Sequence, residues 1–246
     1  MIKNMESIIL HNIRKYKIPV KYKKILTQFT LELLSLYNTR ILLILPSGSC
    51  ARGDVYENWS DIDLIICLNT YNYADICNII QLTSKYCIKI GVNIYSKLEM
   101  NKLIIDGKTK LFLYYAQEKL IPILMKEESF EIPHINFQKI LENDRVVLPG
   151  QIHSLKRTDI DNEDSKTLLK KTNLIMKLML KDKNISPLGY KNVFDYFQLI
   201  YDIDLIDIED IIKKYNYYDH VIKEFVFYFI DNLNIFIEKY TEGLHK

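Results

Sequence analysis

Residues 47–68 read SGSCARGDVYENWSDIDLIICL, and this stretch decides the fold. The apolar run 41–45 directly before it indicates a short strand that is buried on both faces. Gly48 then lets the backbone turn sharply into a helix and lets a ligand approach closely. The first amides of that helix carry partial positive charge, Ser49 adds a hydroxyl donor, and Arg52 adds a cation one turn later. The sequence therefore predicts a phosphate-binding turn.

Two aspartates follow on the next apolar run, which predicts a strand over residues 61–68. Side chains alternate along a strand, so Asp61 and Asp63 share one face. Two neighbouring carboxylates repel each other unless a cation lies between them, and Mg²⁺ typically takes one or two carboxylates plus substrate phosphates. An Asp-x-Asp pair alone is common on exposed strands. Combined with a phosphate-binding turn, it indicates phosphoryl or nucleotidyl transfer.

The pattern Gly48-Ser49, eleven residues, then Asp61-Ile62-Asp63-Leu64 resembles the signature of the DNA polymerase beta-type nucleotidyltransferase superfamily. The fuller string, with Ala51-Arg52-Gly53 after the turn, resembles its small bacterial and archaeal branch. That branch includes enzymes that adenylylate antibiotics and the minimal nucleotidyltransferases of toxin–antitoxin pairs. The order of the elements extends the resemblance over residues 35–125.

The resemblance implies a role for each residue of the motif. Gly48 and Ser49 would hold the triphosphate of an NTP donor, with ATP as the expected nucleotide. Asp61 and Asp63 would bind two Mg²⁺ ions. A hydroxyl would then displace pyrophosphate at the α-phosphorus, with the metal ions stabilising the entering and leaving oxygens.

The chain departs from the family on the next predicted strand, residues 87–95. The family usually has a third carboxylate there, where this chain has Asn93. An asparagine carbonyl is a neutral ligand and a poor base. Three explanations stay open: Asn93 is a weaker ligand in a working enzyme, another acid is the base, or the site binds nucleotide without efficient turnover. The alternative acids are Glu99, Glu118 and Glu131.

Other cationic residues have open roles as well. Arg52 either binds phosphate or pairs with a carboxylate, Asp54 or Glu57. Four cations of the C-terminal half either reach the triphosphate or lie at solvated helix ends: Lys156, Arg157, Lys170 and Lys171.

Hydrophobic periodicity predicts an α+β fold, a nucleotidyltransferase-type mixed sheet with flanking helices, followed by an all-helical domain. Two helices separated by Pro19 are expected over residues 2–38, and Pro46 is expected to stop the first strand. A further helix is expected over residues 73–86. The predicted domains are a nucleotidyltransferase domain, a linker region and a helical C-terminal domain, at residues 1–130, 131–160 and 161–246.

Composition narrows the classes of function. The chain has 246 residues, 48% of them hydrophobic, and a formal net charge of +2, so no global field favours nucleic acid. No segment reaches the roughly 18 apolar residues that span a bilayer. Four scattered cysteines fit free thiols in a reducing cytosol, so we expect a cytoplasmic protein.

The first functional hypothesis is Mg²⁺-dependent transfer of a nucleoside monophosphate from an NTP to a small-molecule hydroxyl. The separate helical domain favours it, because antibiotic-modifying enzymes of the resembling branch have this layout. The alternatives are an antitoxin-like nucleotidyltransferase that modifies a partner protein, and a nucleotide-binding module with a weakened site. Resembling enzymes commonly dimerise, so a homodimer is possible.

Overall fold

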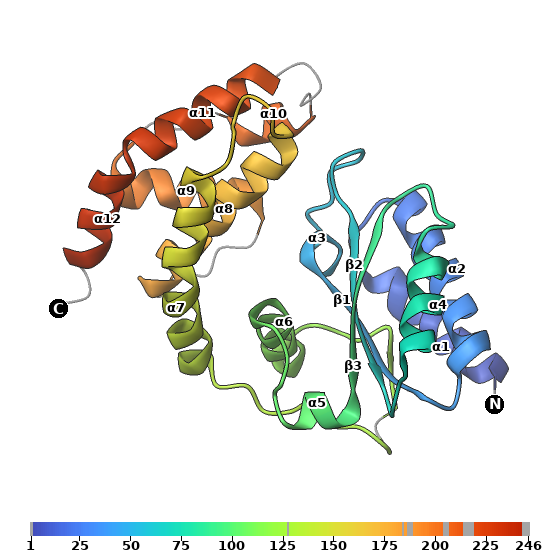
Figure 1. The fold of residues 1–246 in the computed structure, drawn as a ribbon. Coiled ribbons are helices and arrows are strands. Elements are labelled where there is room, and N and C mark those ends of the chain that lie inside the picture. The colour runs from blue at the N-terminus through green and yellow to red at the C-terminus, as the bar shows by residue number, and fades with distance from the viewer. Residues whose placement is uncertain are drawn as a thin grey trace. The chain divides into compact units, whose positions relative to one another are not determined.

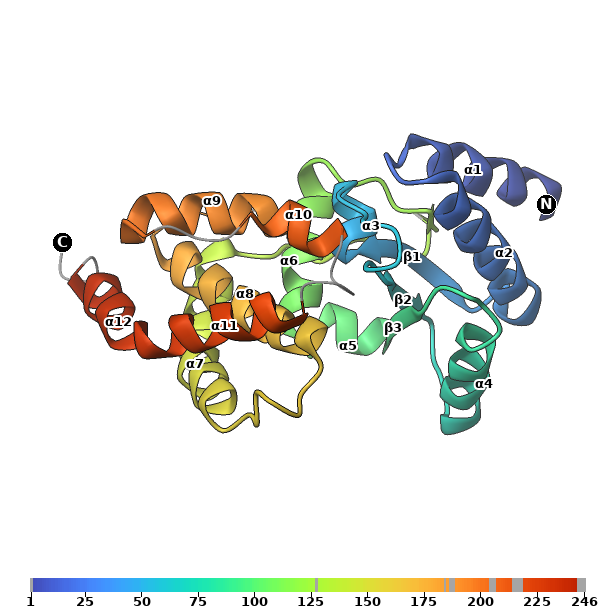
Figure 2. The same cartoon turned by 90° about the horizontal axis from the view of Figure 1, so that it is seen from above.

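The computed structural model describes residues 2–126, 128–183, 185, 189–203, 207–213 and 219–242. The chain divides into two compact units, residues 1–140 and 141–246 (Figures 1 and 2). The first unit extends beyond the boundary near residue 130 that hydrophobic patterning suggests.

The first unit is built on a four-stranded mixed sheet of order β3-β2-β1-β4. Its strands are β1 (Ile41–Ser47), β2 (Ile62–Leu68), β3 (Ile90–Ser96) and β4 (Leu124–Met125). β1 runs antiparallel to both of its neighbours, whereas β2 and β3 run parallel. The end of β1 and the beginnings of β2 and β3 therefore lie side by side at one end of the strands, because Ser47 pairs with Asp63 and Asp63 with Gly91.

Helices cover both faces of this sheet (Figure 1). α1 (Ile2–Lys15), α2 (Val20–Tyr37) and α4 (Tyr73–Thr83) pack on the face that carries Leu64 and Ile66. α5 (Lys97–Asn101) and α6 (Gly107–Glu118) pack on the face that carries Ile65 and Cys67. Alternation along β2 therefore supplies two cores, and Asp63 shares the face of Ile65 because the two are two residues apart.

Local signals start these helices where they begin. Pro19, the N-cap of α2, separates it from α1 as expected. Asn72 and Asp75 form a capping box at the start of α4. At the start of α6 the carboxylate of Asp106 accepts the Thr109 N–H at 2.9 Å, which satisfies one of the free amides of the first turn.

Pro46 does not stop the first strand, contrary to the sequence-based expectation. β1 continues through Pro46, which pairs with Leu64, to Ser47. Within the described residues β4 pairs with β1 only at Leu43 and Ile44, so the strand has a neighbour on one side only at Pro46. Proline is tolerated there because an edge position needs no second ladder hydrogen bond.

The predicted linker of residues 131–160 contains a helix, α7 (Phe137–Lys156), with Pro149 inside it. Ile140, Leu148 and Leu155 are buried on this helix at helical spacing. The second unit continues with α8 (Ser165–Asp182), α9 (Tyr190–Tyr201), α10 (Ile208–Lys213), α11 (Asp219–Asp231) and α12 (Leu233–Glu242). Its core is aromatic, with mutually contacting rings of Phe197, Tyr201, Phe229 and Phe236.

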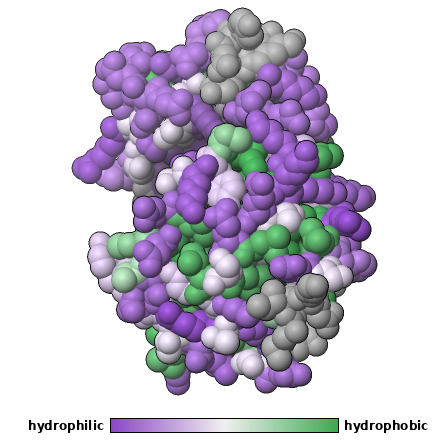
Figure 3. Space-filling model, turned by 90° about the vertical axis from the view of Figure 1, so that its right-hand side faces the viewer, coloured by the Kyte–Doolittle hydropathy of each residue, from purple (hydrophilic) through white to green (hydrophobic). Residues whose placement is uncertain are grey.

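In the part of the chain that the structure describes, no helix is both long and apolar enough to cross a membrane. All four cysteines are free, with Cys50 and Cys67 buried and Cys77 and Cys87 exposed. Hydrophobic surface shows between hydrophilic residues on the side of the first unit that bears α1, α2 and α4 (Figure 3). The exposed apolar residues of these helices include Ile8, Val20, Leu36 and Ile80.

Candidate active site

The turn after β1 is built around Gly48. β1 passes directly into α3 (Gly48–Arg52), and Gly48 adopts φ +61°, a left-handed conformation that favours glycine. A Cβ at this position would lie 2.4 Å from Asp63 Oδ2, so a side chain has no room. The Asp63 carboxylate therefore lies directly against the backbone of the turn.

A second glycine encloses Asp63 from β3. A Cβ at Gly91, its register partner, would lie 2.8 Å from Asp63 Oδ1. The two oxygens of one carboxylate thus each lie beside a glycine: Gly48 directly follows β1, Gly91 lies in β3, and both strands border β2. This arrangement leaves space at the carboxylate where side chains would otherwise fill it.

We expect Gly48→Ala to damage this site through both effects. The left-handed backbone should cost about 1–2 kcal/mol of unfolding free energy for a residue with a Cβ, and the new methyl group must displace Asp63. Urea unfolding and nucleotide titration measure the two losses separately. The matched control is Gly150→Ala in α7, where a Cβ would have no atom within 4 Å. Equal behaviour of the two variants would contradict the close packing at Gly48.

Asp61 immediately precedes β2, and Cys50 connects it to the turn. The Cys50 thiol lies 3.9 Å from the carbonyl oxygen of Asp61. Burial, followed by the charge of Asp63, raises the pKa of Cys50 to about 12. Cys50 therefore stays a protonated packing residue and is no nucleophile at neutral pH.

Arg52 and Ser49, the two polar residues of α3, make different contacts. Arg52 is largely buried, and its Nε donates to Asp54 at 3.1 Å, so the ion pair is the arrangement that the structure contains. The Ser49 carbonyl accepts the Gly53 N–H at 2.8 Å, which closes the short helix. The Ser49 hydroxyl makes no hydrogen bond within the described residues, so it is available to a ligand.

Lys108, which sequence patterning did not single out, contacts Asp63 directly. Its Nζ lies 2.9 Å from Asp63 Oδ2, and the two side chains are 47% and 33% exposed. Lys108 belongs to the first turn of α6. The signal that predicts this turn is Asp106 as N-cap before Gly107-Lys108-Thr109, but nothing in the sequence pairs Lys108 with Asp63.

Asn93 lies on the same face of the sheet, two residues beyond Gly91 on β3. Its Nδ2 donates to Asp106 Oδ2 at 3.1 Å and to Thr109 Oγ1 at 3.3 Å. The Tyr95 hydroxyl also donates to Asp106. Burial opposes the charged form of Asp106, but hydrogen bonds from Tyr95 and Thr109 outweigh it and lower the pKa. Asn93 thus faces a carboxylate that already accepts hydrogen bonds from Tyr95 and Thr109.

The alternative acids have distinct surroundings. Glu99 closes the capping box of α5, accepting from the Ser96 N–H at 2.7 Å and the Tyr71 hydroxyl at 3.0 Å. Burial raises its pKa, but the hydrogen bonds from Ser96 and Tyr71 outweigh that and leave it below the ordinary value. Glu99 also follows the far end of β3, about 16 Å along the strand from Gly91.

The other two acids are less defined. Glu131 is exposed in the segment before α7. The side chain of Glu118 lies outside the part of the chain that the structure describes. Of the cations in the second unit, Lys171 binds Thr158 and Glu163 within that unit, at 3.0 and 3.4 Å.

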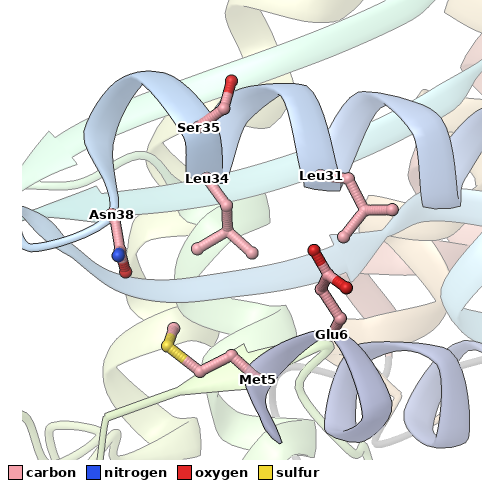
Figure 4. Close-up of a pocket in the computed structure, with 6 residues that line it drawn as sticks. All are labelled: Met5, Glu6, Leu31, Leu34, Ser35 and Asn38. Carbon is pink, nitrogen blue, oxygen red and sulfur yellow. The ribbon is translucent and has the colours of Figure 1, made fainter. Parts of the chain in front are cut away.

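Two pockets of the first unit lie away from Asp63. One, of about 150 Å³, lies between α1 and α2 and is mostly apolar, with Met5, Leu31 and Leu34 among its residues (Figure 4). The other, of about 300 Å³, borders the end of α3 and is strongly basic. Its cationic residues are Lys15, Lys17, Arg52 and Lys119. Neither contains Asp61 or Asp63.

The oxygen donors at this end of the strands fit a hard divalent cation whose coordination shell is completed by a substrate. No group of three or more His, Cys, Asp or Glu residues gathers as a metal site within the described ranges, so an all-protein cage is absent there. Asp61 and Asp63 would supply carboxylate oxygens, the ligands that Mg²⁺ takes in sites that are completed by phosphates. The Lys108 ammonium already occupies a cation position at Asp63.

The model of the Nucleotidyltransferase domain family matches residues 26–200. The chain belongs to this family. It is a nucleotidyltransferase, and the matched range contains the turn at Gly48 together with β2 and β3. No curated protein has a sequence that matches the nucleotidyltransferase.

Solved structures extend the likeness to the fold. The nucleotidyltransferase matches spectinomycin adenyltransferase AAD(9) from Enterococcus faecialis, crystallised with ATP and spectinomycin, with a TM-score of 0.56 and 13% identity. That match covers 92% of this chain and 99% of the other. A nucleotidyltransferase-like protein from Exiguobacterium sibiricum matches with a TM-score of 0.30 and 10% identity, covering 88% and 78%. The first of these similarities shows a shared fold; the second score is too low to support one.

Proposed function

We propose that this nucleotidyltransferase moves a nucleoside monophosphate from ATP to a hydroxyl group of a small molecule, with Mg²⁺ and with release of pyrophosphate. The observation that carries the proposal is the position of Asp63 between Gly48 and Gly91. A carboxylate enclosed by two glycines leaves room for a phosphate and its cation at the same point.

Asp61 and Asp63 are the residues that would hold Mg²⁺. Bound there, the ion would supply charge neutralisation for the triphosphate and for the departing pyrophosphate. The chain's own residues orient the nucleotide. Gly48 lets the phosphates approach the backbone, and the Ser49 hydroxyl donates to a phosphate oxygen. Asn93, held by Asp106, offers a carbonyl oxygen on the same face.

The reaction forms one bond and breaks one. The acceptor hydroxyl oxygen bonds to the α-phosphorus, and the bond from that phosphorus to the pyrophosphate oxygen breaks. The hydroxyl proton needs a base, and Asn93 cannot serve as one. Glu99 follows the C-terminal end of β3, whereas Asp63 lies beside Gly91 at the beginning of that strand. We therefore propose Glu118 or Glu131 for this role.

The class of acceptor is inferred from the matched fold. The Enterococcus faecialis enzyme shares the fold over nearly its whole length, and its crystal contained spectinomycin together with ATP. We therefore propose a hydroxyl-bearing small molecule as acceptor, with spectinomycin as the first compound to test. A cytoplasmic location and a homodimer are also part of this proposal.

Calorimetric titration with each of the four NTPs, with and without Mg²⁺, tests the nucleotide site. We expect saturable binding of ATP that requires Mg²⁺, because the carboxylates repel a triphosphate unless a cation lies between them. Absence of binding for all four NTPs would contradict the proposal and favour a decayed site.

Pyrophosphate release then tests the acceptor. We expect release with the hydroxyl-bearing acceptor and none with its deoxy analogue, which lacks the attacking oxygen. Labelling of a co-expressed polypeptide from α-³²P-ATP, without small-molecule turnover, would instead support the protein-modifying alternative.

A further inference from the structure

We propose that Lys108 is a resident counterion of the nucleotide site, which occupies Asp63 before substrate arrives and then binds the triphosphate. The inference deepens the proposed function and rests on it. Its basis is the ion pair of 2.9 Å between Lys108 Nζ and Asp63 Oδ2 on the oxygen that lies against Gly48.

The residues before and after Lys108 in the chain are held in place by contacts with β3. Asp106, two residues before it, accepts from Asn93 Nδ2 at 3.1 Å and from the Tyr95 hydroxyl. Thr109, the next residue, lies 3.3 Å from the same Asn93 nitrogen and is fully buried. These contacts attach the first turn of α6 to β3. The ammonium group is therefore brought to Asp63 by an anchored turn.

Charge determines what Lys108 does at this position. A divalent cation on Asp63 and an ammonium group on the same carboxylate repel each other, so Lys108 weakens metal binding in the absence of nucleotide. A triphosphate reverses this balance, because it brings several negative charges to the same point. The flexible, half-exposed lysine stem then lets the ammonium move from carboxylate to phosphate. Metal ion and nucleotide would thus bind together.

The test uses two affinities that should change in opposite directions in Lys108→Met. We expect Mn²⁺ alone, followed by electron paramagnetic resonance of the free ion, to bind about fivefold more tightly than in the wild type. We expect α,β-methylene-ATP, titrated at saturating Mg²⁺, to bind about fivefold more weakly.

Two further variants isolate the charge. Lys108→Arg keeps the positive charge, so we expect both affinities to stay near the wild-type values. Lys110 lies on the same helix, and its side chain has no hydrogen bond or ion pair within the described residues. Lys110→Met should therefore change neither affinity. Lys108→Gln repeats the test if Lys108→Met does not fold.

The outcomes separate this inference from the proposed function. A wild-type protein that binds neither Mn²⁺ nor the analogue would overturn the proposed function. A wild type that binds both, together with a Lys108→Met variant of unchanged affinities, would overturn only the role of Lys108. Parallel loss of both affinities in Lys108→Met would indicate a purely structural lysine and would also overturn it.

Discussion

Asp63→Asn should lower nucleotidyl transfer about 100-fold or more, because a metal ion contributes several kcal/mol to the transition state and each 1.4 kcal/mol is a factor of ten. The amide keeps the shape of the side chain between Gly48 and Gly91 but loses the charge. Binding of ATP in the presence of Mg²⁺ should fall with it. Steady-state pyrophosphate release and calorimetry measure the two effects.

The fold should tolerate Asp63→Asn. The variant removes a half-exposed ion pair with Lys108, and such pairs contribute about 0.2–1 kcal/mol. The matched control is Asp195→Asn in the second unit, which breaks a pair of similar exposure with Lys191, 2.7 Å long. Retained transfer in Asp63→Asn, with a melting temperature equal to that of the control, would rule out the site at the β1–α3 turn.

Asn93→Asp is expected to destabilise the protein by about 1–3 kcal/mol, because it removes a donor from Asp106 and places two carboxylates together. If Asn93 is a weakened ligand, the sequence alone suggests the opposite outcome for the site, a gain in metal affinity from a restored acid. Asn93 Nδ2 lies 3.1 Å from Asp106 Oδ2, however, so the introduced charge would be repelled by Asp106. The single variant should therefore bind Mn²⁺ no more tightly than the wild type.

The double variant Asn93→Asp with Asp106→Asn should recover stability and bind Mn²⁺ more tightly than the wild type. The exchange reverses the donor and acceptor of the pair and moves the negative charge onto the strand. Asparagine caps a helix as well as aspartate, so the first turn of α6 should survive in Asp106→Asn alone. Urea unfolding and Mn²⁺ titration of the three variants measure this. A single variant that binds Mn²⁺ more tightly than the double would contradict the pairing.

The predictable part of the site is the part that is local in sequence. Gly48 must turn, because a strand that passes at once into a helix needs a left-handed residue, and glycine marks that position. Alternation along the predicted strand of residues 61–68 places Asp61 and Asp63 on one face without any tertiary information, although β2 itself begins at Ile62. The family signature spans the same residues, so motif and geometry report one feature.

The contacts of α6 were not predictable in this way. Its apolar residues form no clear stripe, and its first turn meets Asp63 across 45 residues of chain. Arg52 shows the same limit, because the choice between phosphate and Asp54 depends on distance. The role of Glu118 stays a prediction, since its side chain lies outside the described part of the chain.

By itself, the sequence determined the α+β class, the turn at Gly48, the paired aspartates and the family. It did so because turns, strand alternation and helix caps depend on residues within a few positions of one another. Only the tertiary structure decided that Asn93 is bound to Asp106, that Tyr71 binds Glu99, and that Lys108 neutralises Asp63. Those partners are separated along the chain and meet only because β3 lies beside β2 and α6 packs back onto that sheet.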